Sequence, residues 1–191
     1  MRERIESLNK HPALIVWLTG LSGSGKSTIA NALNDTMFRA GISTAMLDGD
    51  VVRAGLCNDL GFTPEDRAEN IRRVADVAAI LYNLGHVVIC SFISPYAEGR
   101  GYARGLVPPE RFVEIHVRCG IEECERRDPK GLYRKARAGE LQQFTGVDAP
   151  YERPNNSELV IDTETTSTAD SVDAAYQYVM AIVSEWREAT G

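Results

Sequence analysis

The sequence predicts a three-layer α/β/α fold, in which helices cover both faces of a mainly parallel, five-stranded sheet. The first observation is an alternation along the chain, because apolar runs of strand length are separated by helical patterns. These runs are residues 13–18, 44–47, 87–92, 112–117 and 159–161. The second is the length of 191 residues with 43% hydrophobic residues, which suffices for one well-buried core. We therefore expect a single domain over residues 1–191.

Two long helices are expected. The first begins at Pro64, which suits a first helical position after the potential cap Thr63, and it ends at Gly85. Its apolar stripe consists of Ile71, Val74, Ala78 and Leu81. The second covers residues 170–187 and closes the chain. Its inward-facing residues are Val172, Tyr176, Val179 and Val183.

Composition limits the partners and the location. The formal net charge is −6, from 21 Lys and Arg against 27 Asp and Glu, which gives no electrostatic basis for wrapping nucleic acid. No apolar run approaches the roughly 20 residues that span a bilayer, and residues 1–12 lack the apolar region of a signal peptide. We expect a cytoplasmic protein with no nucleic-acid and no membrane partner. The cysteines lack the paired spacing of a zinc site: Cys57, Cys90, Cys119 and Cys124.

Residues 20–28 read GLSGSGKST and follow the first apolar run. Gly20, Gly25, Lys26 and Ser27 satisfy G-x-x-x-x-G-K-[ST], the phosphate-binding loop of P-loop NTPases, and a strand before and a helix after are the required context. Glycines let the backbone N–H groups point at phosphate oxygens, and the helix N-terminus adds positive potential. Lys26 would reach the β and γ phosphates and Ser27 would coordinate Mg²⁺. The expected nucleotide-binding residues are Gly20, Leu21, Ser22, Gly23, Ser24, Gly25, Lys26, Ser27 and Thr28.

Two aspartates follow the second predicted strand. In an extended chain Asp48 and Asp50 would face the same side, at the carboxyl edge of the sheet where ligands bind. One could accept or orient the proton of an acceptor hydroxyl, and the other could help fix the metal ion. A simple Asp-Gly-Asp turn is the alternative. The N-K-x-D signature of GTPases is absent from the sequence, which favours a small-molecule kinase over a GTPase switch.

The segment after these aspartates offers an acceptor pocket. Arg53, Arg67 and Asn70 supply hydrogen-bond donors, and Phe62 supplies a flat face for a base. Guanidinium groups suit an anionic acceptor, because they bind phosphate or sulfate bidentately. Ordinary surface charge on a helix is the alternative for each arginine.

Residues 126–146 interrupt the alternation and are expected to form a basic lid. The alternative is a solvated helix face. Its cations are Arg126, Arg127, Lys130, Arg134, Lys135 and Arg137.

Five motifs, in this order along the chain, together resemble the adenylylsulfate (APS) kinase family. They are LDGD-x-x-R-x-GL-x-x-DLGF, DRAENIRR, FISPY, DPKGLYRKARAGE and FTGVDAPYE, and the resemblance covers about residues 15–162. It implies transfer of the γ-phosphoryl group of MgATP to the 3′-hydroxyl of adenosine 5′-phosphosulfate. It also implies a homodimer and functional coupling to ATP sulfurylase. Val51 and Ala54 depart from residues common in the family, which we expect to affect affinity for the acceptor.

The resemblance also implies residue roles. Lys26, Asp50 and Ser94 would be catalytic, and Arg127 would lie against the ATP base. The remaining residues would bind the acceptor, with Phe62 and Phe144 on either side of its adenine: Asp48, Arg53, Phe62, Arg67, Asn70, Ile93, Lys130, Leu132 and Phe144. Two alternatives stay open, a P-loop kinase for another small anionic, nucleotide-like acceptor and a nucleotide-binding regulator without catalysis.

Overall fold

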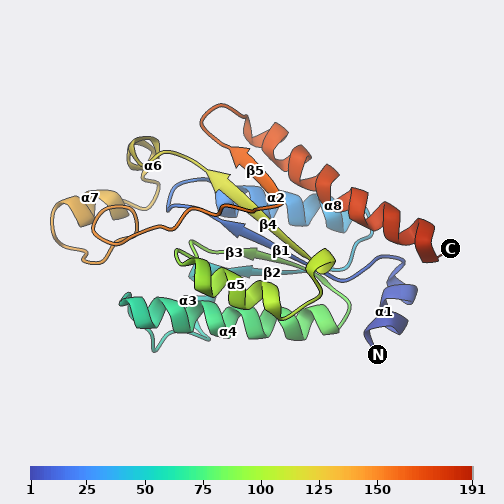
Figure 1. Cartoon of the computed structure of the whole chain (residues 1–191). Coiled ribbons are helices and arrows are strands. Elements are labelled where there is room, and N and C mark those ends of the chain that lie inside the picture. The colour runs from blue at the N-terminus through green and yellow to red at the C-terminus, as the bar shows by residue number, and fades with distance from the viewer. Residues whose placement is uncertain (191) are drawn as a thin grey trace.

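The computed structural model describes residues 1–190 and confirms the three-layer α/β/α arrangement (Figure 1). Its five strands pair in parallel in the order β2-β3-β1-β4-β5. Each bound lies within about one residue of the run expected from sequence, which is ordinary variation for strand ends. The strands are β1 (Leu14–Thr19), β2 (Thr44–Asp48), β3 (Val87–Ser91), β4 (Phe112–Arg118) and β5 (Leu159–Asp162).

The helices include both long helices expected from sequence, here α4 and α8. Thr63 caps α4 by accepting a hydrogen bond from the backbone N–H of Asp66 at 3.2 Å, and Gly85 follows its end with a φ of 84°. The helices are α1 (Arg2–Asn9), α2 (Lys26–Arg39), α3 (Gly49–Ala54), α4 (Pro64–Asn83), α5 (Ala97–Gly105), α6 (Ile121–Arg127), α7 (Leu132–Arg137) and α8 (Thr168–Thr190), with a 3₁₀ turn η1 (Pro109–Arg111).

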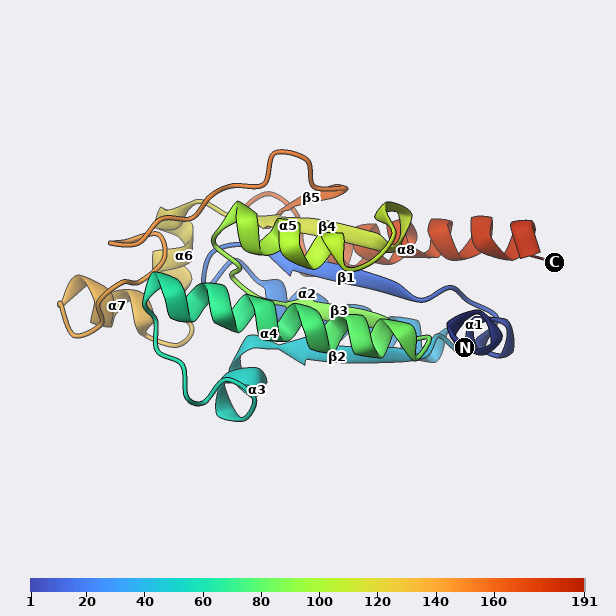
Figure 2. The same ribbon diagram turned by 60° about the horizontal axis from the view of Figure 1, so that its bottom comes forward.

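The central strand β1 separates two hydrophobic cores, and all of its residues are buried. Leu14, Val16 and Leu18 face the core that α2 and α8 cover. Ile15 and Trp17 face the core that α4 and α5 cover, and Figure 2 shows these two helices side by side over the sheet. A strand that is buried on both faces has a continuous run of apolar residues in its sequence, and this run made β1 predictable.

Helix α5 is a feature that the sequence pattern did not predict. It contains Gly99, Gly101 and Gly105, and glycine has a low intrinsic helix propensity. A Cβ at Gly99 would lie 3.1 Å from Cγ2 of Ile71 on α4. Glycine at this position therefore permits the close packing of α5 on α4.

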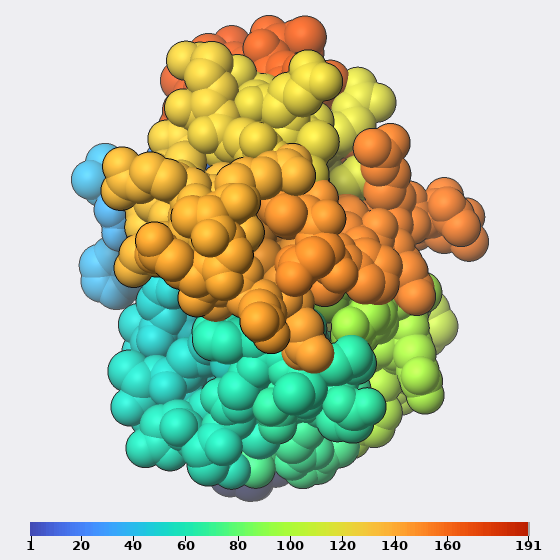
Figure 3. Space-filling view, turned by 90° about the vertical axis from the view of Figure 1, so that its left-hand side faces the viewer, coloured from blue at the N-terminus to red at the C-terminus, as the bar shows by residue number. Residues whose placement is uncertain are grey.

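The segment from α6 to residue 149 projects beyond the carboxyl ends of the strands (Figure 1). Its residues Cys124, Tyr133 and Phe144 form a small apolar cluster with Cys119, which precedes α6. Figure 3 shows the part of this segment after α6, in orange, lying against the teal residues around the start of α4. The residues expected to form a lid therefore face the carboxyl edge of the sheet.

Within residues 1–190 no helix combines the length and the apolar character that crossing a membrane requires. All four cysteines are buried free thiols. Cys90 lies in β3 at 0% exposure, and burial raises its pKa because a thiolate there would be desolvated. It packs as a small apolar residue.

The α2 side of the core provides a test of the packing. Leu33 is fully buried there, so Leu33→Ala should leave a cavity and lower the free energy of unfolding by about 2–5 kcal/mol. Phe38 on the same helix is 71% exposed, and Phe38→Ala should change it by less than about 0.5 kcal/mol. Urea unfolding measures both variants, and equal losses would contradict the packing described here.

Candidate active site

A cleft of about 1040 Å³ lies at the carboxyl edge of the sheet. The phosphate-binding loop (residues 20–28), the residues after β2 and β3, the first turns of α4 and the basic segment (residues 126–146) all contribute to its walls. In open parallel sheets this edge is where ligands bind. The cleft unites every site residue expected from sequence except Gly20, Leu21 and Ser24, which belong to the loop but do not line the cleft.

The loop between β1 and α2 curls tightly. Gly23 and Gly25 have φ angles of 78° and 96°, values that favour glycine. A Cβ at Gly20 would lie 2.4 Å from the carbonyl oxygen of Val117, so the loop presses against β4. Within residues 1–190 no side chain caps the start of α2, which leaves its first backbone N–H groups available to an anion.

Lys26 is the buried cation of the loop. Its side chain lies in the cleft wall with the residue only 9% exposed, and its Nζ donates a 2.7 Å hydrogen bond to the carbonyl oxygen of Leu21. Burial lowers its pKa to about 8, because desolvation penalises the ammonium, while Asp48 and Asp50 act in the opposite direction. A bound anion would restore the charged form.

Ser27 and Asp48 form a cluster of hard oxygen atoms beside Lys26. The Ser27 hydroxyl donates to Oδ2 of Asp48 at 2.8 Å, and its oxygen lies 3.3 Å from the Ser91 hydroxyl. Ser91 was not predicted, although its place at the end of β3 is a signal that could have found it. Carboxylate and hydroxyl oxygens of this kind suit Mg²⁺.

The extended arrangement expected for Asp48 and Asp50 is wrong. Strand β2 ends at Asp48, and its Oδ1 accepts a 3.0 Å hydrogen bond from the backbone N–H of Asp50, so Asp48 caps α3. The Asp50 carboxylate therefore projects from the first turn of a helix. Its side chain is 70% exposed and pairs with Lys130 of the basic segment. Both aspartates nevertheless line the cleft.

Phe62, Arg53 and Arg67 form another wall of the cleft, apart from the phosphate-binding loop. The guanidinium carbons of Arg53 and Arg67 lie 4.4 Å and 5.5 Å from the centroid of the Phe62 ring. Arg67 is buried and donates to the carbonyl oxygens of Phe62 at 3.0 Å and Gln143 at 2.6 Å. Arg67 therefore links the start of α4 to the basic segment. This excludes the alternative that it is an ordinary solvent-exposed charge on the helix surface.

Asn70 is buried in the cleft wall with an unsatisfied donor. The residue is 5% exposed, and its Nδ2 has no hydrogen-bond partner among residues 1–190. A buried amide without a partner is costly. Because Asn70 lines the cleft, a ligand acceptor atom would satisfy it.

Ser94 has a buried hydroxyl with both a donor and an acceptor partner. Its oxygen accepts from Nε1 of Trp17 at 3.1 Å and donates to Oγ1 of Thr19 at 2.8 Å. The backbone has a φ of 40°, and its carbonyl accepts from Arg100 at 2.8 Å. Sequence reasoning gave Arg100 no role; the structure buries it beside Glu114 at 3.0 Å, where it fixes the backbone of Ser94.

Thr163 and Tyr133 are two further residues that sequence reasoning missed. Arg127 donates to the carbonyl oxygen of Thr163 at 2.6 Å, and the Thr163 hydroxyl donates to the carbonyl oxygen of Ser24 at 2.9 Å. The Tyr133 hydroxyl donates to the carbonyl oxygen of Ser22 at 3.0 Å. Thr163 directly follows β5 at the carboxyl edge, which is the signal that could have found it.

The basic segment, together with Ile93 after β3, supplies further residues of the cleft. Phe144 is buried and meets the ring of Tyr133 edge to face, with centroids 4.9 Å apart. Ile93 contributes a carbonyl that accepts from the Thr19 hydroxyl at 2.8 Å. Lys130, Leu132, Phe144 and Ile93 all line the cleft.

Known proteins resemble this chain over most of its length. The family model described as adenylylsulphate kinase matches residues 12–162. An adenylyl-sulfate kinase of Geotalea uraniireducens is 54% identical over 171 residues, which cover 90% of this chain and 82% of that protein. One of Staphylococcus epidermidis is 50% identical over 90% of this chain and 86% of its own length.

A solved structure of the Mycobacterium tuberculosis APS kinase CysC in complex with AMPPNP and APS superposes with a TM-score of 0.81. It is 44% identical and covers 91% of this chain and 99% of its own. A hexameric APS kinase from Thiobacillus denitrificans is 30% identical with a TM-score of 0.65, covering 94% of this chain and 30% of its own. On the family match and these identities, the chain belongs to the adenylylsulfate kinase family.

Proposed function

We propose that the cleft transfers the γ-phosphoryl group of ATP, with Mg²⁺, to the 3′-hydroxyl of adenosine 5′-phosphosulfate (APS). The product is 3′-phosphoadenosine 5′-phosphosulfate. The observation that supports these residue roles is that one cleft contains Asp50, the phosphate-binding loop, and the wall formed by Phe62, Arg67 and Asn70. The family membership supports the same reaction. ATP, the donor, would occupy the half of the cleft beside the phosphate-binding loop, and APS, the acceptor, would occupy the half beside the Phe62 wall.

The donor half is the loop with Lys26 and Ser27. The uncapped N-terminus of α2 and the curled backbone offer N–H groups to the phosphates. Lys26 would give up its bond to the Leu21 carbonyl and donate to the β and γ phosphates. Ser27 and Asp48 would hold Mg²⁺, directly or through its waters. When bound, the ion neutralises charge on the transferring group.

Arg127 is proposed to contact the base of ATP. It lines the cleft, and its bonds to Thr163 place it at the carboxyl end of β5. A planar guanidinium can stack on a base. The ion pair with Glu123, at 2.7 Å, holds the arginine in this position from α6.

The acceptor half is the wall of Phe62, Phe144 and the buried polar groups. The adenine of APS would lie between the two aromatic rings. Arg53, Arg67 and Asn70 would bind the phosphosulfate and ribose, because guanidinium groups favour anions and the Asn70 amide lacks a partner. Ile93 and Leu132 would supply apolar contacts to the same molecule.

Asp50 is proposed to accept the proton of the 3′-hydroxyl. As the 3′-oxygen bonds to the γ-phosphorus, the bond from that phosphorus to the β–γ bridging oxygen breaks and ADP leaves. The hydroxyl proton passes to the Asp50 carboxylate. Lys130 pairs with Asp50 before substrates bind, so it brings a positive charge from the basic segment to the place where phosphoryl charge is transferred.

Ser94 is proposed to position the residues around it. Its hydroxyl is engaged by Trp17 and Thr19, so nucleophilic attack on a phosphate would require both bonds to break. Direct transfer requires only positioning and charge stabilisation. Ser94 would instead fix the backbone of Ile93 and Pro95, both of which line the acceptor half.

The chain is further proposed to act as one domain in which residues 126–146 close over the bound substrates. Exclusion of water by such a segment protects the phosphoryl group from hydrolysis. A homodimer, functional coupling to ATP sulfurylase and a cytoplasmic location are proposals that rest on the family alone. Hexameric assembly is described for the Thiobacillus denitrificans relative.

Acceptor preference tests the proposed function. With MgATP, APS should be phosphorylated at a rate within the ~1–100 s⁻¹ of typical kinases, and adenosine should be a much poorer acceptor because it lacks the 5′-anion that the arginines bind. A coupled assay of ADP release and chromatography of the products measure the phosphorylation rates of APS and of adenosine. Faster phosphorylation of another anionic nucleotide would favour the alternative acceptor class, and nucleotide binding without any turnover would favour a regulator.

The Asp50 carboxylate provides a second test. Asp50→Asn removes the proton acceptor and should lower kcat by about 10²–10⁴-fold, with little change in the Kd for MgATP. Asp173→Asn, on the exposed side of α8, is the matched control and should leave kcat unchanged. Steady-state kinetics and calorimetry measure these values. An unchanged kcat in Asp50→Asn would remove Asp50 from this role.

Lys26 makes nucleotide binding depend on pH. Its pKa of about 8 in the free protein means that it loses its proton as the pH rises above that value, whereas a bound triphosphate favours the charged form. Affinity for MgATP should therefore be constant below about pH 7 and fall as the pH rises above 8. Lys26→Met should bind more weakly and lose this fall. Calorimetry between pH 7 and 9.5 measures the affinity for MgATP of both proteins. If the affinity of Lys26→Met falls as steeply with pH as that of the unmodified protein, Lys26 is not the group responsible.

A further inference from the structure

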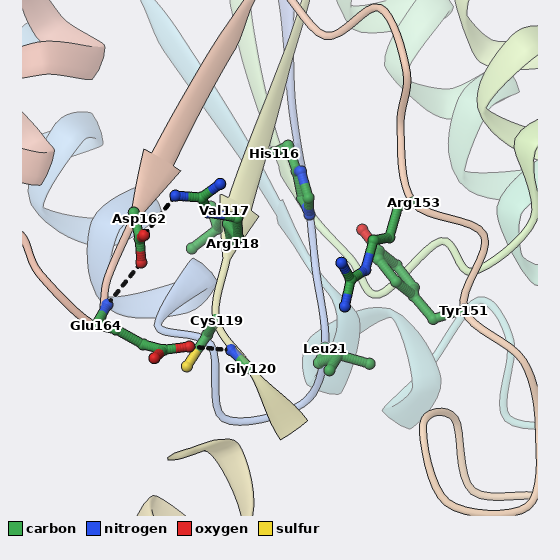
Figure 4. Close-up of a pocket in the computed structure, with 10 residues that line it drawn as sticks. All are labelled: Leu21, His116, Val117, Arg118, Cys119, Gly120, Tyr151, Arg153, Asp162 and Glu164. Atoms are coloured by element: carbon green, nitrogen blue, oxygen red, sulfur yellow. Dashed lines mark hydrogen bonds and ion pairs between the residues drawn. The ribbon is translucent and has the colours of Figure 1, made fainter. Parts of the chain in front are cut away.

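A second, smaller pocket of about 300 Å³ includes Leu21 of the phosphate-binding loop. Figure 4 shows its residues, which come from the ends of β4 and β5, from the loop residue Leu21 and from the segment around Tyr151. No residue of this pocket lines the cleft. Leu21 connects the two, because its side chain lines the pocket and its carbonyl accepts the Lys26 hydrogen bond.

The carboxylates of the pocket are already satisfied. Asp162 pairs with Arg118 and accepts a hydrogen bond from the backbone N–H of Glu164 at 3.1 Å. Glu164 accepts a hydrogen bond from the backbone N–H of Gly120. Figure 4 shows these contacts on the side of the pocket that β5 forms. Neither carboxylate needs a cation to complete its bonding.

The nitrogen-bearing side chains His116 and Arg153 differ from these carboxylates. Among residues 1–190, neither the His116 ring nor the Arg153 guanidinium forms a hydrogen bond or an ion pair that meets ordinary distance criteria. His116 is only 8% exposed, and in Figure 4 its imidazole and the Arg153 guanidinium point toward the same space. The ring nitrogens of His116 are not among the fully buried side-chain atoms of residues 1–190 that lack a partner, and Arg153 is exposed. Both groups therefore face the opening of the pocket, where a ligand would accept hydrogen bonds from them.

The potential at His116 is positive. Desolvation is the main reason that its pKa falls to about 4, and the charges of Arg100, Arg153 and Arg118 lower it further. These three guanidinium groups lie on α5, on the segment after Tyr151 and on β4. The Tyr151 hydroxyl on the same wall is occupied by Thr19 at 3.1 Å. An anion would be attracted by this potential and would supply acceptor atoms to the N–H groups of His116 and Arg153.

We propose that this pocket binds a tetrahedral oxyanion of the sulfate or phosphate class, held by His116 and Arg153. A guanidinium presents a planar fork that matches two oxygens of such an ion, and the N–H of the neutral His116 imidazole donates to a third. The carboxylates on the far wall, held by Arg118 and the backbone, do not compete for Arg153. The site does not depend on the reaction proposed for the cleft.

The test uses the histidines as reporters. The chain has three histidines, and His11 and His86 both bond to Ser43 at the opposite edge of the sheet. In protein with ¹⁵N-labelled histidine, sodium sulfate or phosphate at constant ionic strength should shift the His116 resonances saturably and leave the other two unchanged. Absence of a His116 shift at tens of millimolar ion would overturn the proposal.

Two variants separate this pocket from the phosphate-binding loop, which also attracts anions. Arg153→Ala should weaken the His116 titration by about tenfold or more, the value of one charge-assisted hydrogen bond, and Arg39→Ala on the surface of α2 should not. Lys26→Met should retain the titration. A His116 shift that survives in Arg153→Ala and vanishes in Lys26→Met would show transmission from the loop and would overturn the site.

The source of the oxyanion is distinguished in the Lys26→Met background. Saturable shifts with inorganic sulfate or phosphate alone identify a free ion as the ligand. Tighter titration by adenosine 5′-monophosphate than by phosphate identifies the phosphate group of a nucleotide. Either result supports an oxyanion site, and equal shifts with sodium chloride would overturn it by showing a general effect of salt.

Discussion

The geometry of the cleft depends on the tight curl of the backbone between β1 and α2. Gly20 lies so close to the Val117 carbonyl that no Cβ fits there, and Gly23 and Gly25 have positive φ angles. The curl leaves backbone N–H groups at the start of α2 without a side-chain cap from residues 1–190. It also buries the Lys26 ammonium, which lowers its pKa. A loop that is unsatisfied in this way binds anions strongly.

Distant parts of the chain hold this loop from several sides. Tyr133 from α7 donates to the carbonyl of Ser22, and Thr163 after β5 donates to that of Ser24. Arg127 bonds to Thr163 in turn. The basic segment is therefore anchored on the loop at one end, while Lys130 reaches Asp50 across the cleft. This arrangement places positive charge on both sides of the proposed transfer path.

The strands and the two long helices were predictable because each shows its burial pattern directly in the sequence. The loop and the cleft residues were also predictable, because glycine spacing and family motifs are local. The relative orientation of the Asp48 and Asp50 side chains was not predictable from the sequence. It depends on whether β2 continues past Asp48 or a helix begins at Gly49. Thr163 and Tyr133 were missed because their bonds span 139 and 111 residues, and no local pattern records such contacts.

A structure of the ternary complex tests most directly whether two adenosine-bearing anions meet beside Asp50. A crystal of this protein with APS and a non-hydrolysable ATP analogue gives the distance from the Asp50 carboxylate to the 3′-oxygen of APS. We expect a separation within hydrogen-bond reach, about 2.6–3.2 Å, with that oxygen facing the γ-phosphorus. A 3′-oxygen turned away from the triphosphate, or bonded to Ser94 in place of Asp50, would contradict it.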